Sequence, residues 1–197
     1  MKNRFLIALV LLGMFSCQKK AETIENGSTI DSTKLDTIDK IEIDTASVSK
    51  DTKAVETIRK QLIELLKKDL PVMTKDNRFF YYDTFDLNND GKEEYFVGFA
   101  NPYFCGTGGC SGYILNNDGT LINSFTVTDF PIFVATTSSE KFQDLIMKSR
   151  DSFHYIKMKN GKYPSNPSVQ EKWKGEIPKQ SSVLLNIYEG KYEKYSI

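Results

Sequence analysis

Apolar side chains recur at helical spacing in one stretch of the chain. The positions are Val55, Ile58, Leu62, Leu65 and Leu66, and charged residues fill much of the sequence between them. In a helix of 3.6 residues per turn this spacing forms a single apolar stripe, because residues three and four apart share a face. Pro71 follows and is expected to end the helix. The stretch therefore predicts a helix that packs through one face.

Beyond Pro71 the helical period gives way to short apolar runs between turn residues. Aromatic and β-branched residues enrich these runs, as is typical of strands. The segments Asn117-Asp118-Gly119 and Lys159-Asn160-Gly161 have the composition of hairpin turns. The predicted strands are residues 79–85, 94–100, 111–115, 121–128, 132–136, 145–148, 153–158 and 183–188. Because no helical crossover separates them, the fold class we predict is α+β, with an N-terminal helix packed on a mainly antiparallel β-sheet meander.

The polar segment before the helix has a different composition. Ser, Thr, Asp, Glu and Lys dominate residues 18–52, which contain no aromatic residue and no sustained hydrophobic period. Such a segment buries too little apolar surface to offset the entropy lost on ordering. We therefore predict a flexible linker over residues 17–52 and a single globular α+β domain over residues 53–197.

The first residues have the order of a secretory signal peptide. Lys2 and Arg4 precede an uncharged apolar run over residues 5–15, and the small Ser16 stands before Cys17. The run is too short to span a bilayer. The segment Met14-Phe15-Ser16-Cys17 resembles a lipobox, which implies a signal peptide of residues 1–16, lipidation of Cys17 and anchoring to a membrane of the bacterial cell envelope. The alternative is cleavage of the signal peptide without a lipid.

The cysteine count fits an exported protein. The chain has three cysteines, so one is left over after pairing. If Cys17 carries lipid, Cys105 and Cys110 remain, and the three glycines between them allow a tight ring. We predict a Cys105–Cys110 disulfide. A zinc site would need further ligands, and the spacing is not that of a C-x-x-C redox pair.

An acidic loop precedes the second predicted strand. Side-chain oxygens stand at alternate positions, Asp86, Asn88 and Asp90, followed by Gly91 and then by Glu94. A Ca²⁺ ion takes six to eight oxygen ligands, which alternate residues of a tight loop can supply. The predicted ligands are Asp86, Asn88, Asp90, Glu94 and, through its backbone carbonyl, Lys92. The alternative is an ordinary turn, since turns favour Asp, Asn and Gly.

The acidic loop resembles the calcium loops of FG-GAP, or integrin α-chain-like, repeats, whose pattern is D-x-[DN]-x-[DN]-G-x-x-D before a hydrophobic strand. This chain has Glu94 at the last ligand position, where the family has Asp. It has one full copy of the loop, so a complete propeller is not implied. With the C-G-x-G-G-C loop that follows, the segment also resembles one in small, uncharacterised bacterial exported proteins, which implies export and paired cysteines.

Charge and the remaining residue types restrict the function classes. The chain carries 26 basic and 26 acidic residues and no basic patch, so nucleic acid is not an expected partner. The sole histidine, His154, has no positioned catalytic motif beside it. Tyr103 and Phe104, beside the cysteine loop, are candidate binding residues for a protein or glycan. We expect a non-catalytic envelope binding module; the alternatives are an inhibitor or immunity protein against an envelope-targeted enzyme, a structural accessory of the envelope, or a hydrolase.

Overall fold

A computed structural model of the chain describes residues 45–189 and 192–197. The predicted signal peptide of residues 1–16, Cys17 and residues 18–44 of the predicted linker lie outside the described residues. Within the described part of the chain, no helix is both long and apolar enough to cross a membrane.

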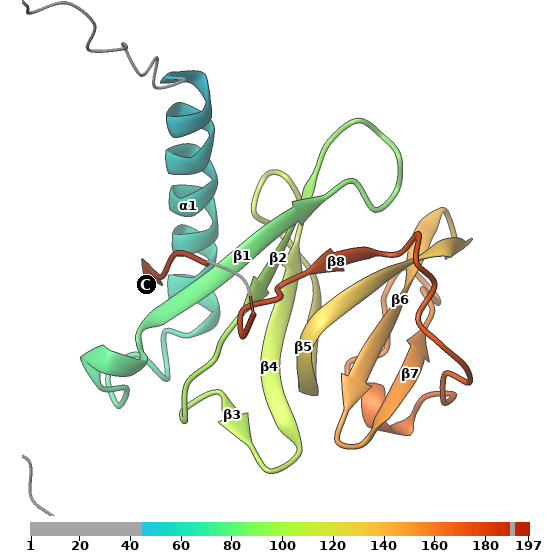
Figure 1. Cartoon of the computed structure of the whole chain (residues 1–197). Helices are drawn as coiled ribbons and strands as arrows, with labels where there is room; N and C mark the ends of the chain where they lie inside the picture. Colours follow the sequence, from blue (N-terminus) through green and yellow to red (C-terminus); the bar gives the residue numbers. More distant parts are fainter. Residues whose placement is uncertain (1–44, 190–191) are drawn as a thin grey trace, which may run out of the picture. The chain divides into compact units, whose positions relative to one another are not determined.

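One α-helix and nine strands form the described fold, and Figure 1 shows how most of them are arranged. The helix, α1, covers Thr45–Leu65, so residues 45–52 of the predicted linker are helical. The strands are β1 (Phe79–Phe85), β2 (Glu94–Gly98), β3 (Cys105–Gly106), β4 (Gly109–Leu115), β5 (Leu121–Ser139), β6 (Phe142–Ser149), β7 (Ser152–Ile156), β8 (Ser182–Leu184) and β9 (Tyr195–Ser196). Two short 3-10 helices are η1 (Lys75–Asn77) and η2 (Pro167–Val169).

All strand pairings are antiparallel. The strand order is β7-β6-β5-β4-β2-β1-β9, while β3 pairs with β4 and β8 pairs with β5. Consecutive strands β4, β5, β6 and β7 are joined by short turns, as expected where no helix carries the chain across a sheet.

The predicted fold class, α+β with an N-terminal helix, is wrong. The structure is mostly antiparallel β-sheet with one α-helix among the described residues, and that helix begins at Thr45 rather than at the N-terminus. The physical reason is that one helix can cover only a few strands of a nine-stranded sheet. The helix covers a single face of part of the sheet, and the rest of the core forms between strands without any helix.

The apolar stripe of α1 packs as its spacing predicts. Val55, Ile58, Leu62 and Leu66 are buried in one cluster with Phe80 and with residues of β2 and β4. Successive residues of a strand point to opposite faces of its sheet. On β2, Tyr95 and Val97 accordingly face the helix, whereas Phe96 lies in a second cluster. Because both of its faces are covered, every residue of β2 is buried.

The second cluster includes residues from both parts of the long strand β5, such as Phe125 in the first part and Ile132 and Val134 in the second. Residues 121–128 of β5 pair with β4, and the later part pairs with β6 and β8 (Figure 1). The register shifts between Asp129 and Ile132, where Pro131 has no N–H to donate. The strands predicted separately at 121–128 and 132–136 are therefore one strand that changes partners at this irregularity.

Candidate functional site

A groove of about 520 Å³ lies beside α1 and β1, within the size range of ligand sites, about 300–1,000 Å³. We call it the tyrosine groove. Its lining residues are Ala54 of α1, Tyr82, Asp83 and Thr84 of β1, Glu93 and Tyr95 at β2, Asn117 of the β4–β5 turn, and Tyr192, Glu193 and Tyr195 at the C-terminal end. The groove therefore depends on the tertiary fold, since no short segment of the sequence contains it.

Three of the groove tyrosines pack against one another. The ring of Tyr82 lies 6.3 Å from that of Tyr95 and 5.4 Å from that of Tyr195, measured between centroids. Tyr195 also lies 5.7 Å from Phe80, which is fully buried under α1. Because β9 pairs with β1 at Phe80, the sheet itself fixes the Tyr195 ring beside Tyr82. These rings form a wall whose orientation is set by packing, as aromatic binding surfaces require.

The fourth tyrosine is held by a carboxylate. The Tyr192 hydroxyl donates to Oδ2 of Asp83 at 2.5 Å, and the Leu185 N–H donates to the same oxygen at 2.5 Å. The Asn186 N–H in turn donates to the Tyr192 hydroxyl at 3.1 Å. Burial, together with the hydrogen bond to Asp83, raises the pKa of Tyr192 to about 12. Tyr192 is therefore a neutral donor at physiological pH, and Asp83 joins β1 to the C-terminal segment.

The charged residues in the described lining of the groove are acidic. Asp83, Glu93 and Glu193 line it, and among the described lining residues there is neither Lys nor Arg. The Tyr195 hydroxyl donates to Oε2 of Glu193 at 3.1 Å. Lys194, between these two residues, places its Nζ over the ring of Phe79 at 4.7 Å. Within this lining the groove is acidic, although the whole chain is formally neutral.

The acidic loop lies next to the tyrosine groove. A smaller hollow of about 180 Å³ is lined by Asp90, Lys92, Glu94 and the turn residues Asn116, Asn117 and Asp118. Asn117 lines both the hollow and the groove. The loop predicted to bind calcium therefore borders the groove, and its residue Glu93 lines the groove itself.

The loop oxygens accept hydrogen bonds from their own backbone. The Asp86 carboxylate accepts from the N–H groups of Asp90 at 3.1 Å and Gly91 at 2.9 Å. Asn88 Oδ1 accepts from Asp90 N–H at 2.9 Å, and Asp90 Oδ1 accepts from Lys92 N–H at 2.8 Å. The Asn88 and Asp90 contacts, each to the N–H two residues on, are the Asx turns that Asn and Asp form in tight loops, and Asp86 spans the loop to Asp90 and Gly91.

Glu94, the last predicted ligand, is only 2% exposed. Its Oε2 accepts from the Leu87 N–H at 2.8 Å. Burial raises the pKa of Glu94, and the nearby charges of Asp90 and Asp86 raise it further. In the part of the chain that the structure describes, no three His, Cys, Asp or Glu side chains converge as metal ligands do. Calcium binding at this loop stays a prediction.

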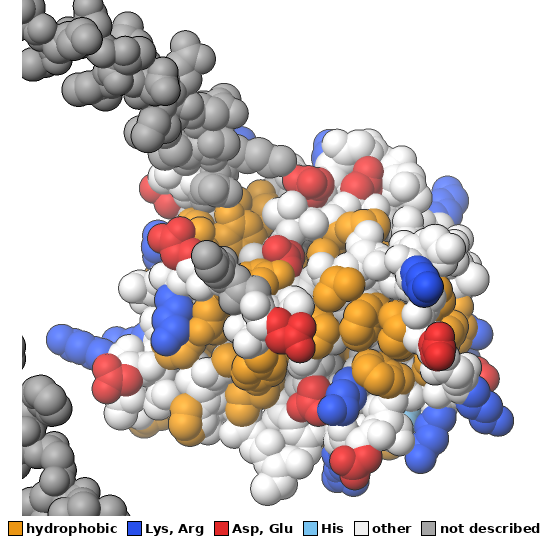
Figure 2. Space-filling model, viewed as in Figure 1, with side chains coloured by type: hydrophobic (Ala, Val, Ile, Leu, Met, Phe, Trp, Pro, Cys, Tyr) orange, Lys and Arg blue, Asp and Glu red, His pale blue; other side chains and the backbone are white. Residues whose placement is uncertain are grey.

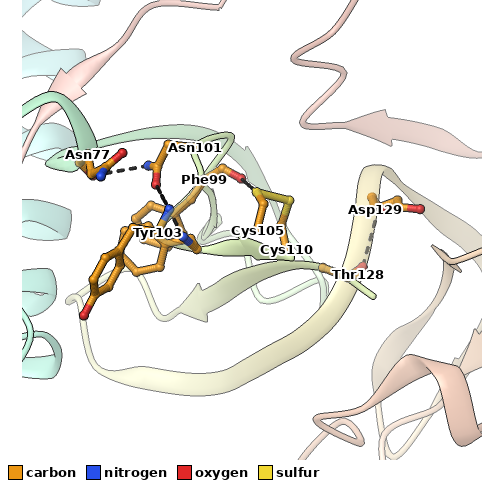
Figure 3. The surroundings of a disulfide bond; sticks show 9 residues. Asn77, Phe99, Asn101, Tyr103, Cys105, Cys110, Thr128 and Asp129 are labelled. Carbon is orange, nitrogen blue, oxygen red and sulfur yellow. Dashed lines mark hydrogen bonds between the residues drawn. A yellow bond between two sulfur atoms is a disulfide. The ribbon is translucent and has the colours of Figure 1, made fainter. Parts of the chain in front are cut away.

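The predicted disulfide is confirmed (Figure 3). Cys105 and Cys110 are bonded and face each other in the β3–β4 pair, with Gly106 opposite Gly109. Gly109 has φ +123°, and a Cβ there would lie 2.6 Å from the backbone carbon of Val127. Glycine is therefore required at this position by both its backbone angle and the close approach of β5.

The two aromatic residues before the disulfide differ in their contacts. Phe104 is half-buried and stacks on Phe99, with centroids 3.9 Å apart. Tyr103 is 38% exposed and points away from the disulfide in Figure 3, and its hydroxyl donates to Asp69 at 2.8 Å. Neither residue lines the tyrosine groove. A surface at Tyr103 would be a site separate from the groove.

His154 is buried on β7, with 3% of its surface exposed. Its Nδ1 lies 3.0 Å from the carbonyl oxygen of Gln170, a partner that accepts from an Nδ1–H tautomer. This contact fixes the ring against the segment that follows β7. It gives His154 a packing role in the fold.

A second surface hollow, of about 250 Å³, has the opposite charge. It is lined by Tyr155, Lys157, Glu171, Lys172, Trp173 and Lys174. Basic side chains also gather on the side of the molecule that carries β7 in Figure 2. Lys157 already lies over the Tyr155 ring, 4.3 Å from its centroid. The described surface thus has an acidic tyrosine groove and, separately, a lysine-rich hollow.

Sequence reasoning missed the tyrosine groove. The signals that could have indicated it are Tyr82 in the segment FFYYDTF and the two tyrosines of the C-terminal segment YEKYSI. Nothing in the linear sequence shows that these two segments pair as β1 and β9.

Comparisons with protein-family models, with curated proteins and with solved structures found no match to this chain.

Proposed function

We propose that the protein is a non-catalytic binding module that holds a protein or glycan ligand in the tyrosine groove. The observation that carries this proposal is the groove itself, a ligand-sized concavity with aromatic walls and a few fixed polar groups. Aromatic rings provide contact area at low cost in conformational entropy. Their mutual packing keeps that area in place before a ligand arrives.

We further propose that the protein works at a bacterial cell envelope, anchored to a membrane by a lipid on Cys17. The support is the sequence of residues 1–17, with its charged start, apolar run and cysteine. The polar segment after Cys17 would serve as a spacer between the membrane and the domain.

Metabolic labelling with a fatty acid tests the anchor. The wild-type chain should take up the label, and Cys17→Ser should lose it because Cys17 is the cysteine at the predicted cleavage site, whereas Cys105 and Cys110 are bonded to each other. The matched control is the double variant Cys105→Ser with Cys110→Ser, which should keep the label. Labelling that persists in Cys17→Ser would contradict the anchor.

Peptide and glycan arrays test the binding role. The probe is the mature chain with Cys17→Ser, so that lipid does not cause background. Tyr82→Ala should weaken binding of any genuine ligand about tenfold, since aromatic anchors dominate such sites. Tyr103→Ala, an exposed tyrosine outside the groove, is the control and should bind normally. Loss with Tyr103→Ala alone would move the site to the disulfide loop.

A further inference from the structure

The geometry points to a second binding site, in the lysine-rich hollow beside β7, for one hexuronic acid unit of an acidic glycan. The sugar places its carboxylate at the lysines and its ring against Trp173. This inference is independent of the tyrosine groove, because the two sites share none of their described lining residues.

The lining of the hollow is positioned by backbone pairing with β7. The Tyr155 N–H donates to the carbonyl of Glu171 at 2.8 Å. The Trp173 N–H donates to the carbonyl of Phe153, also at 2.8 Å. Lys172 lies between these two bonds and pairs with β7 in an antiparallel bridge. Pairing of this kind sets where each side chain leaves the backbone, so the hollow belongs to the edge of the sheet.

The two aromatic rings of the hollow are also held in place. The Tyr155 hydroxyl donates to Oδ2 of Asp144 at 2.9 Å, and Asp144 is only 2% exposed. The Thr137 hydroxyl donates to the same oxygen at 2.8 Å. The Trp173 ring packs on that of Tyr155 with centroids 5.3 Å apart, and its Nε1–H donates to the carbonyl of Glu176 at 3.3 Å. A ligand therefore meets rings that are already oriented, which lowers the entropic cost of binding.

The charge of the hollow selects an anion. The charged residues of its described lining are three lysines, Lys157, Lys172 and Lys174, and one glutamate, Glu171. This positive excess is local, because the whole chain is formally neutral. Lysine ammonium groups only donate hydrogen bonds, and an ionised carboxylate only accepts them. Complementarity of this kind favours an anionic ligand and speeds its encounter with the site.

The remaining lining favours an acidic sugar over a phosphodiester group. Glu171 is an acceptor to which a sugar hydroxyl can donate, whereas a phosphodiester has no proton to donate. The apolar C–H face of a sugar ring can also pack on Trp173, since an aromatic face is electronegative. The volume of about 250 Å³ lies below the range of about 300–1,000 Å³ for sites that enclose a whole small ligand. The hollow therefore suits one unit of a longer chain.

Fluorescence titration with trigalacturonate tests the inference. Trp173 is the only tryptophan of the chain, so its emission reports binding at the hollow directly. The mature chain with Cys17→Ser should show a saturable change in emission, with an affinity that falls as salt is added. The matched probe is the same trisaccharide with every carboxyl group methyl-esterified, which keeps the sugar rings and removes the charge. It should bind about tenfold more weakly.

Paired lysine variants locate the contact. Lys172→Gln with Lys174→Gln should weaken trigalacturonate binding about tenfold. The control pair, Lys60→Gln in α1 with Lys68→Gln just after it, removes the same charge from exposed positions and should change affinity by about twofold or less. Trp173→Leu removes the fluorescent ring, so calorimetry measures its affinity, which should fall about fivefold. Thermal melts confirm that each variant is folded before its affinity is compared.

Three results would overturn the inference. Equal affinity for the acidic and the esterified trisaccharide, or equal loss in both lysine pairs, would remove the charge contact. Sedimentation with phosphatidylglycerol vesicles, without binding of trigalacturonate, would replace the sugar with an anionic lipid surface. Absence of trigalacturonate binding would reject the hollow as an acidic-glycan site and leave the tyrosine groove, which Tyr82→Ala tests, as proposed.

Discussion

The acidic loop and the tyrosine groove are neighbours that arise in different ways. The loop is a run of nine residues, Asp86 to Glu94, whose polar groups mainly bond to their own backbone. The groove joins residues from Ala54 to Tyr195 and exists only when β1, β2 and β9 pair. A local motif can be recognised in the sequence whether or not it binds a ligand. A composite groove is invisible in sequence, although its side chains are the better placed to hold a ligand.

The largest expected loss of stability is at Asp83 in the groove, which joins β1 to the C-terminal segment through its hydrogen bonds. Asp83→Ala would leave the Leu185 N–H and the Tyr192 hydroxyl without their acceptor. Hydrogen bonds to charged groups are worth about 1.5–3 kcal/mol, so we expect a loss of about 2–3 kcal/mol in the free energy of unfolding. Urea denaturation measures it. Asp83→Asn keeps an acceptor oxygen and should lose less; an equal loss would contradict the acceptor role.

The disulfide should affect stability without affecting the groove. Closing a ring of this size stabilises a protein by about 2 kcal/mol through the unfolded chain. Cys105→Ser with Cys110→Ser should therefore lower the melting temperature by a matching amount. Binding of a groove ligand should remain, because neither cysteine lines the groove. If binding falls at temperatures where the variant is fully folded, the groove and the disulfide loop are coupled, contrary to this account.

Within the acidic loop the expected effect is smaller. Asp86→Ala removes the acceptor of two exposed backbone N–H groups and should cost about 1 kcal/mol of folding stability. Calorimetry with Ca²⁺ and Mg²⁺ decides whether the loop binds a metal ion or is only a turn. If the calcium prediction is right, Ca²⁺ should bind in preference to Mg²⁺ and raise the melting temperature, and Asp86→Ala should abolish both effects. If the wild-type chain gives no heat of binding with calcium, the calcium prediction is wrong and the loop is an ordinary turn.

A separate expected effect concerns pH. Because the pKa of Tyr192 is raised to about 12 in the folded chain, the folded state holds this proton more tightly than the unfolded state. Folding stability should therefore fall as the pH rises from about 10, the usual tyrosine value, through about 12. Tyr192→Phe should lessen that fall. Ultraviolet difference titration against Tyr192→Phe should assign the late ionisation, and a Tyr192 that ionises with the exposed tyrosines would refute the contact.

The parts of the fold that sequence could predict are those with local causes. The stripe Val55, Ile58, Leu62 and Leu66 is buried as its spacing predicts, and the predicted strand 79–85 is β1. The cysteine pair also formed as predicted. Each of these depends on residues close together in the chain, where period, turn chemistry and spacing are informative.

The parts that sequence could not predict have distant causes. β3 and β9 have two residues each, too few for any alternation to show. The long β5 was divided at Pro131, because a proline breaks the strand pattern locally while the partners on either side preserve the strand. The fold class was wrong for a related reason. How much of a sheet one helix covers depends on tertiary packing, which no local period encodes.

The central claim is that the tyrosine groove holds a ligand, and chemical-shift mapping tests it most directly. Backbone resonances of the mature Cys17→Ser chain would be followed while a ligand selected on the peptide and glycan arrays is added. The account predicts shifts at Tyr82, Asp83, Glu93 and Tyr195, with little change at Asp86 and Asn88 or at Lys172 and Trp173. Shifts concentrated on the acidic loop, or no shifts at the groove under saturating ligand, would contradict it.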